Sequence, residues 1–283
     1  MYNDSALRVS EPPSPSLPKN ARLPINRCNL PAVILGSLRF QQHPAALELD
    51  GVAELHVDLF RHLDATADLC QRAEIFQAYM RGHFSLDDLK QAGLQKRHAK
   101  SRAKADYLRM MRGWLFDADG REGAVLKGFI ESRFGLLARY HKGSLSDFHS
   151  EAYHRYTYER CKGLYNTNAL EAQLDLLYSF CQYELRRRFP KRSHLTVFRG
   201  INRLEDHEVI ERLSRTEAVV LLNNLNSFSS HRDRADEFGD YILTAQIPLS
   251  KIFFFQDLLP GMLRGEGEYV VIGGVYQVSI DLL

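Results

Sequence analysis

Residues 264–272 read RGEGEYVVI, a pair of acids leading into an apolar run. The β-branched residues at 270–272 favour a strand, and we expect that strand to begin near Glu268. Side chains two positions apart on a strand point to the same side, so Glu266 and Glu268 would aim two carboxylates into one space. Like charges this close resist ionising together unless a cation or hydrogen-bond donors lie nearby. The acid pair therefore predicts partner residues from elsewhere in the chain.

The first candidate partner segment is LTVFRG at residues 195–200. Arg199 ends a strand pattern, and a guanidinium at the rim of a sheet suits a phosphate or a carboxylate. Gly200 follows it, and a glycine there allows a ligand or another backbone to come close.

The second candidate segment is NSFSS at residues 226–230. Ser227 and Ser229 alternate at what we expect to be a strand end, where their hydroxyls suit a carboxylate or a ribose. Phe228 faces the other way, and it or a neighbouring aromatic residue could stack on a flat ring. The segment has no Gly-X-Ser-X-Gly elbow, which argues against a serine hydrolase.

Composition and charge exclude several functional classes. The 283 residues are 45% hydrophobic and 25% charged, as in an ordinary globular protein, and the formal charge of +2 is too small to favour nucleic acid. The four cysteines have no short spacings, which argues against a disulfide framework or a zinc site. The eleven histidines form no His-Glu-X-X-His pattern, so a metal site has no support. With no apolar run of membrane-spanning length and no signal-peptide core, we expect a cytoplasmic protein without a membrane span.

Composition and sequence pattern divide the chain into three parts. Residues 1–24 are rich in proline and serine, a composition that cannot bury enough apolar surface to offset chain entropy, so we expect a flexible leader there. A helical part is expected over about 45–190 and a β-rich part over about 194–283, together making one domain from 25 to 283. Because strands do not alternate with helices, the fold class is α+β.

Periodicity predicts the individual elements. Asn168 and Glu171 have the spacing of a capping box, and Pro190 would end the helix that follows. The apolar stripe of that helix is Leu170, Leu174, Leu177, Cys181 and Leu185. Other helices are expected at 47–63, 73–80, 104–116, 123–134, 136–141, 206–214 and 232–238. Strands are expected at 195–198, 218–222, 241–247, 252–255 and 269–278.

The order strand-Arg-Gly, Ser-X-Ser, Glu-X-Glu resembles the Arg-Ser-Glu class of mono-ADP-ribosyltransferases. The wider sequence is similar to one family of that class, the NAD-dependent dinitrogenase reductase ADP-ribosyltransferases. The stretches that carry the resemblance are SLPKNARLPINRCNLP at 16–31, the block 104–141, LYNTNALEAQLDLL at 164–177 and LLPGML at 258–263. The resemblance implies a β-rich core of two small sheets with an NAD cleft between them, onto which the helical part packs.

The resemblance also implies roles for single residues. Arg199 would anchor the co-substrate NAD through its phosphates, with Gly200, Phe228 and Ser229 nearby. Ser227 would orient Glu268, the catalytic carboxylate, and Glu266 would engage an arginine acceptor. The usual Ser-Thr-Ser appears here as SFSS, which leaves open whether the hydroxyl of 227, 229 or 230 contacts Glu268. Residues 257–264 would form the loop that presents the target protein.

The activity implied is that of a glycosyltransferase that moves ADP-ribose from NAD to an arginine of dinitrogenase reductase, inactivating it and regulating nitrogen fixation, with a P-II-type nitrogen-signalling protein as a regulatory partner. No metal is implied. Two alternatives stay open: an NAD glycohydrolase, for which water is the acceptor, and a non-catalytic module that binds NAD or a protein.

Overall fold

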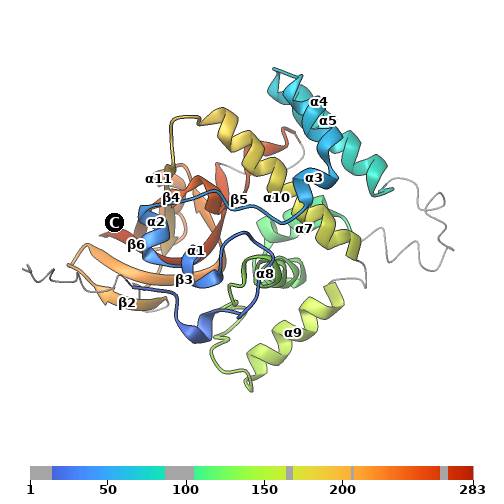
Figure 1. Ribbon diagram of the computed structural model, residues 1–283. Coiled ribbons are helices and arrows are strands. Elements are labelled where there is room, and N and C mark those ends of the chain that lie inside the picture. Colours follow the sequence, from blue (N-terminus) through green and yellow to red (C-terminus); the bar gives the residue numbers. More distant parts are fainter. Residues whose placement is uncertain (1–14, 87–104, 164–167, 205–206, 262–266, 283) are drawn as a thin grey trace, which may run out of the picture.

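The computed structural model describes residues 15–86, 105–163, 168–204, 207–261 and 267–282 (Figure 1). The first part of the chain is helical and the last third is mostly strand, which confirms the α+β class. The helices are η1 (Lys19–Ala21), α1 (Ala32–Leu35), α2 (Leu38–Gln42), α3 (Val52–Leu55), α4 (Val57–Asp64), α5 (Leu69–His83), α7 (Tyr107–Phe116), α8 (Arg121–Phe134), α9 (Glu151–Gly163), α10 (Asn168–Arg188), α11 (Arg232–Asp236), η3 (Leu249–Lys251) and η4 (Gln256–Leu258). The strands are β1 (His194–Ile201), β2 (Glu208–Arg212), β3 (Glu217–Ser229), β4 (Tyr241–Pro248), β5 (Ile252–Phe255) and β6 (Glu268–Leu282).

Two long antiparallel strands, β3 and β6, form the spine of the sheet. They pair from Glu217↔Ser279 at one end to Ser229↔Glu268 at the other. The shorter strands flank them: β2 pairs with the first half of β3, β5 with the first half of β6, and β4 with the second half of β6. β1 pairs with β4 along its length and meets the end of β3 at Phe198↔Ser229. The end of β3 that carries Ser227 is thereby brought beside both β1 and the start of β6.

The ladder between β3 and β6 is interrupted at its middle, where the register shifts between Leu222 and Leu225. Gly273 lies opposite this irregularity, and a Cβ there would come within 1.7 Å of the Asn223 carbonyl oxygen. Bulged strands bend and twist more strongly than regular ones. The six described strands thus form one hydrogen-bonded sheet with an irregularity at its middle, whereas the family resemblance implied two small sheets.

The helix α10 is the largest helical contribution to the core, and it runs beside β5 (Figure 1). Its expected apolar stripe is confirmed, because all five members have an exposed fraction of 1% or less. The ring of Phe180 stacks on Phe76 of α5 at 4.1 Å between centroids. The helix ends at Arg188, shortly before Pro190, as predicted.

The helix α8 contacts two neighbouring helices and the strand β3. It packs between α7 and α9, and its buried residues include Val125, Phe129 and Ile130. Asn224, at the irregularity in β3, donates its side-chain amide to the Lys127 carbonyl oxygen at 2.8 Å. The middle of α8 is therefore held against the irregularity in β3.

Three sequence-based expectations need correction. The leader does not reach residue 24: residues 1–14 lie outside the described part, but Leu17 and Ala21 are buried and Leu23 donates a backbone hydrogen bond to Gly135. The stretch 136–141 is extended, since Gly135 ends α8 in the left-handed conformation and Leu136 bridges to Arg22.

The third correction concerns the expected helix at 206–214, which is instead the edge strand β2. All five of its residues are exposed, so the strand has no buried face. Its apolar residues therefore show neither the period of a helix nor that of a strand. The helix α9 was not predicted, because its face is mostly polar and few of its side chains are buried. In the described part of the chain, no helix combines the length and apolarity needed to cross a membrane.

Candidate active site

Ser227 and Glu268 lie on one face of the β3–β6 pair. In the register, Ser227 is opposite Val270 and Glu268 is opposite Ser229, so the two side chains are diagonal neighbours. The Ser227 hydroxyl donates a hydrogen bond of 2.6 Å to Oε1 of Glu268. The structure therefore brings together these two residues, which are distant in sequence, and it selects Ser227 as the hydroxyl that contacts the acid.

Arg199 lies at the end of β1 next to this pair. Its Nη1 donates a 2.7 Å hydrogen bond to the backbone oxygen of Ser227. Its Nε is buried without a hydrogen-bond partner among the described residues. Burial lowers the pKa of Arg199, while the negative charges of Asp119 and Glu268 oppose that shift. A guanidinium stays protonated in proteins, so the site holds a cation with donor capacity that the described residues leave unused.

Glu268 is half-buried, and its environment acts on its pKa in two directions. Burial raises the pKa because the charged carboxylate loses water. The hydrogen bond from Ser227 and the charge of Arg199 lower it. Burial has the largest effect, so the pKa lies above its ordinary value, and the two neighbours oppose this rise by favouring the ionised form.

The other residues of the predicted site contact backbone groups of the protein itself. Gly200 packs against α11, and a Cβ there would lie 2.0 Å from the Ala235 carbonyl oxygen, so the close approach is made by another backbone. The Ser229 hydroxyl accepts a 3.0 Å hydrogen bond from the His231 backbone N–H. The Ser230 hydroxyl donates to the Gly267 carbonyl oxygen at 3.3 Å. Both hydroxyls thus help to order the end of β3 and the start of β6.

Two predicted site residues cannot be placed beside Glu268. Phe228 is only 3% exposed and belongs to the hydrophobic core, so its ring is not available to stack on a ligand at this site. Glu266 lies outside the described residues, as does part of the loop expected at 257–264.

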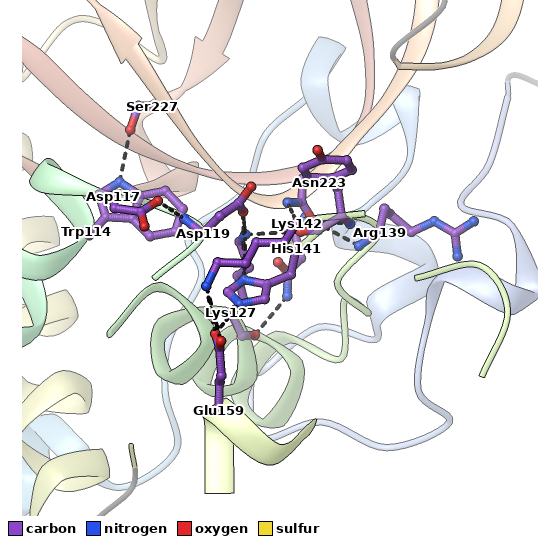
Figure 2. A network of polar contacts seen from close by, with 12 residues as sticks. Trp114, Asp117, Asp119, Lys127, Arg139, His141, Lys142, Glu159, Asn223 and Ser227 are labelled. Atoms are coloured by element: carbon purple, nitrogen blue, oxygen red, sulfur yellow. Dashed lines mark hydrogen bonds and ion pairs between the residues drawn. The ribbon is translucent and has the colours of Figure 1, made fainter. Parts of the chain in front are cut away.

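Sequence reasoning missed the residues that reach the site from the helical part. The indole N–H of Trp114, on α7, donates a 2.9 Å hydrogen bond to the Ser227 hydroxyl oxygen (Figure 2). Lys127, on α8, is 1% exposed and donates a 2.6 Å hydrogen bond to Asp119 in the turn between the two helices. No sequence motif indicates such contacts. The only signal in the sequence is that Trp114 is the single tryptophan of the chain.

The arrangement combines an anion-binding guanidinium, an oriented carboxylate and a hydroxyl within one small region. Such a set can hold a phosphate-bearing ligand and stabilise positive charge that develops beside the carboxylate. Within the described ranges, no group of three or more His, Cys, Asp or Glu side chains is arranged to hold a metal ion.

Comparison with known proteins gives the family of the chain. Residues 25–280 match the model of a family described as dinitrogenase reductase ADP-ribosyltransferase (DRAT). The chain belongs to the dinitrogenase reductase ADP-ribosyltransferase family. Within the curated proteins, it is similar to the NAD(+)--dinitrogen-reductase ADP-D-ribosyltransferase of Rhodospirillum rubrum, with 42% identity over 261 residues, 91% of this chain and 95% of that protein. No solved structure matches this member of the dinitrogenase reductase ADP-ribosyltransferase family.

Proposed function

We propose that the protein is a mono-ADP-ribosyltransferase that transfers ADP-ribose from NAD to an arginine of dinitrogenase reductase and thereby inactivates it. The observation that carries the proposal is the hydrogen bond from Ser227 to Glu268, made where Arg199 holds the backbone of the same serine. The family and the activity named for the Rhodospirillum rubrum relative support the choice of NAD and of the target. Control by a P-II-type protein is an expectation from the resemblance alone.

In this proposal Arg199 binds the phosphates of NAD. Its Nη1 is fixed on the Ser227 carbonyl oxygen, and its buried Nε has no partner among the residues that the structure describes. A guanidinium forms strong, directional hydrogen bonds to phosphate oxygens. Ligand phosphates would satisfy the remaining donors and offset the desolvation that lowers the pKa of Arg199.

Glu268 would stabilise the departure of nicotinamide. NAD loses this ring as a neutral group while positive charge develops on the ribose, as in glycoside cleavage through an oxocarbenium-like transition state. An ionised Glu268, held by Ser227, can stabilise that charge through the ribose 2′-hydroxyl. Losing a preorganised group of this kind typically costs ~3 kcal/mol in the transition state, roughly a hundredfold in rate.

Glu266 would act on the acceptor. The side-chain pKa of arginine lies above ~12, so its guanidinium is a poor nucleophile unless a base accepts a proton as the new bond forms. The position of Glu266, two residues before Glu268 and next to the expected target-presenting loop, supports this assignment.

Labelled NAD incubated with the purified protein and dinitrogenase reductase tests the proposal. We expect label on one arginine of dinitrogenase reductase, located by mass spectrometry, together with released nicotinamide. Nicotinamide release without labelled protein would instead establish an NAD glycohydrolase. NAD binding without nicotinamide release would indicate a non-catalytic module, and either result would overturn the proposal.

Substitution of the two acids separates their roles. We expect Glu266→Gln to keep part of the NAD hydrolysis and lose transfer to arginine, because only the acceptor step needs it. Glu268→Gln should lose both reactions, because both pass through the charged ribose. The matched control is Glu211→Gln, an exposed carboxylate on the edge strand β2 that should keep full activity. Equal residual transfer in the two acid variants would contradict these assignments.

A further inference from the structure

Trp114 reaches the site from a helix that the proposed mechanism does not use. Its indole N–H lies 2.9 Å from the Ser227 hydroxyl oxygen, and that hydroxyl lies 2.6 Å from Oε1 of Glu268. The three groups form a continuous chain of hydrogen bonds from α7 through β3 to β6. Figure 2 shows the indole edge pointing at Ser227.

The chemistry of the three groups fixes the direction of this chain. An indole N–H can only donate, and a serine hydroxyl has one proton and two acceptor lone pairs. Because Trp114 occupies a lone pair of the hydroxyl, the single proton of Ser227 is left to point at Glu268. Successive hydrogen bonds in a buried chain polarise one another, so the indole also strengthens the donation to the carboxylate.

We propose that Trp114 is a positioning residue for the reaction: its indole N–H locks the Ser227 hydroxyl in the orientation that donates to Glu268. The proposal rests on the proposed function in taking Glu268 as the catalytic carboxylate. Without the indole, the hydroxyl can rotate away, and Glu268 loses part of the stabilisation of its charge.

The surroundings of Trp114 hold the indole in place. The side chain is 2% exposed, and the ammonium of Lys127 lies 5.9 Å from its ring centroid. This cation is attracted to the face of the ring and is itself held by Asp119 at 2.6 Å. Asp119 is in turn fixed by its backbone N–H, which donates to the Asp117 carboxylate at 2.9 Å. The turn between α7 and α8 thus supports the indole with charged groups that have defined partners.

Two glycines show how closely α7 and α8 approach around this turn. A Cβ on Gly113 would lie 2.4 Å from the Glu122 Cβ, and one on Gly123 would lie 2.1 Å from the Ala118 carbonyl oxygen. Real Cβ atoms do not come this close to other atoms, so the two helices can meet only with glycine at these positions. This packing fixes α7, which carries the indole, against α8.

A double-mutant cycle between Trp114→Phe and Ser227→Ala tests the proposal. We expect Trp114→Phe to lower kcat for transfer by roughly 5- to 30-fold, the loss expected for one hydrogen bond in a chain that ends on a charge, with KM for NAD changed less than about threefold. In the Ser227→Ala background, the same substitution should change kcat less than about twofold. Met110→Leu, a buried volume-conserving change on the same helix, is the packing control and should leave kcat unchanged. A loss of equal size in both backgrounds would show that Trp114 acts only by packing and would overturn the proposal.

A second variant covers the case in which Trp114→Phe unfolds the chain. Because the chain has one tryptophan, β-(3-benzothienyl)alanine can replace it residue-specifically, exchanging the N–H for sulfur with nearly the same shape. We expect this protein to fold and to show the same loss of kcat. Wild-type kcat in this protein would overturn the proposal.

A readout that does not depend on activity separates this proposal from the proposed function. Carbon-13 NMR of the Glu268 carboxyl should show a higher pKa in Trp114→Phe than in the wild type, and no such difference between Ser227→Ala and the double variant. If the wild type transfers no ADP-ribose yet this pKa pattern holds, the proposed function fails and the positioning role stands. If the wild type is active and the Glu268 pKa is unchanged in Trp114→Phe, the positioning role fails alone.

Discussion

Glu268 shows how a few neighbours set the charge of a half-buried acid. Burial raises its pKa, whereas the Ser227 hydroxyl and the Arg199 charge lower it. An acid that stabilises positive charge must be ionised, so removing either neighbour should reduce the active fraction at low pH. The sequence predicted these three residues because each lies at the end or the start of an expected strand. It did not predict Trp114, because a contact between residues 113 positions apart leaves no local signal.

Lys251 is a buried amine away from the proposed chemistry. Its ammonium donates a 2.6 Å hydrogen bond to the Gly273 carbonyl oxygen and lies near the rings of Phe40 and Tyr276, at 5.7 and 5.9 Å from their centroids. Burial lowers its pKa to about 7. The folded protein therefore stabilises the neutral amine, whereas in the unfolded chain the amine keeps its ordinary pKa of 10.5.

This difference predicts that stability rises with pH. Between about pH 7 and 10 the unfolded chain binds more protons at Lys251 than the folded protein, so its contribution to the free energy of unfolding should grow by up to ~1.4 kcal/mol per pH unit. Lys251→Met cannot titrate and should lack that part of the slope. Urea unfolding of both proteins at pH 7, 8 and 9 measures it. Parallel stability curves for the two proteins would show that Lys251 does not titrate in this range.

At the scale of elements, α5 is attached to α10 by a buried ion pair. Arg72 contacts Glu184 through two hydrogen bonds, of 2.6 and 2.9 Å, and the two side chains are 5% and 0% exposed. The guanidinium also donates to the backbone oxygens of Thr66 and Ala67, ahead of α5. Nη1, the nitrogen that does not contact Glu184, thus stabilises the segment just before α5.

Breaking this pair should be costly, because one buried charge would remain without its partner. We expect Glu184→Ala to lower the free energy of unfolding by ~3–5 kcal/mol. The control is Asp58→Asn on α4, whose pair with Arg61 is 75% and 71% exposed and should contribute less than ~1 kcal/mol. Chemical denaturation of both variants gives the comparison. A Glu184→Ala protein as stable as Asp58→Asn would contradict this view of the α5–α10 contact.

The elements that sequence predicted well are those with one buried face. The stripe on α10 is regular and fully buried, so its period identified the helix directly. The strand β2 has no buried face, and its apolar pair Val209 and Ile210 is about 40% exposed, which is why it was taken for part of a helix. The extended stretch after α8 was misjudged because its conformation follows from pairing with a distant segment, Arg22↔Leu136.

At the scale of the whole molecule, the paired strands β3 and β6 carry the site at one end and an irregularity at their middle. Glycine fits at position 273 because a side chain there would clash with the Asn223 carbonyl. Gly274 beside it has φ +130°, and Val275 donates a 2.8 Å hydrogen bond to Gly36 ahead of α2. The two halves of the sheet and the N-terminal segment thus meet at one point, which local sequence patterns could not predict.

Gly273→Ala tests the importance of that point. An added Cβ would lie 1.7 Å from the Asn223 carbonyl oxygen, so the two strands must separate. We expect a loss of at least ~3 kcal/mol in the free energy of unfolding, the upper end of overpacking costs, and a loss of activity, since both strands carry site residues. Gly82→Ala on α5 has open space around it and should be neutral or stabilising by up to ~1 kcal/mol. Equal thermal midpoints for the two variants would show that the strands tolerate separation here.

We propose that Glu268, held by Ser227 beside Arg199, drives the cleavage of NAD for transfer to dinitrogenase reductase. The most direct test is the single-turnover rate of label transfer from NAD to dinitrogenase reductase by Glu268→Gln, measured beside the wild type at equal folded fraction and with NAD saturating both. We expect a rate at least roughly a hundredfold lower in the variant, with NAD still bound. A rate within a few-fold of the wild type would contradict it.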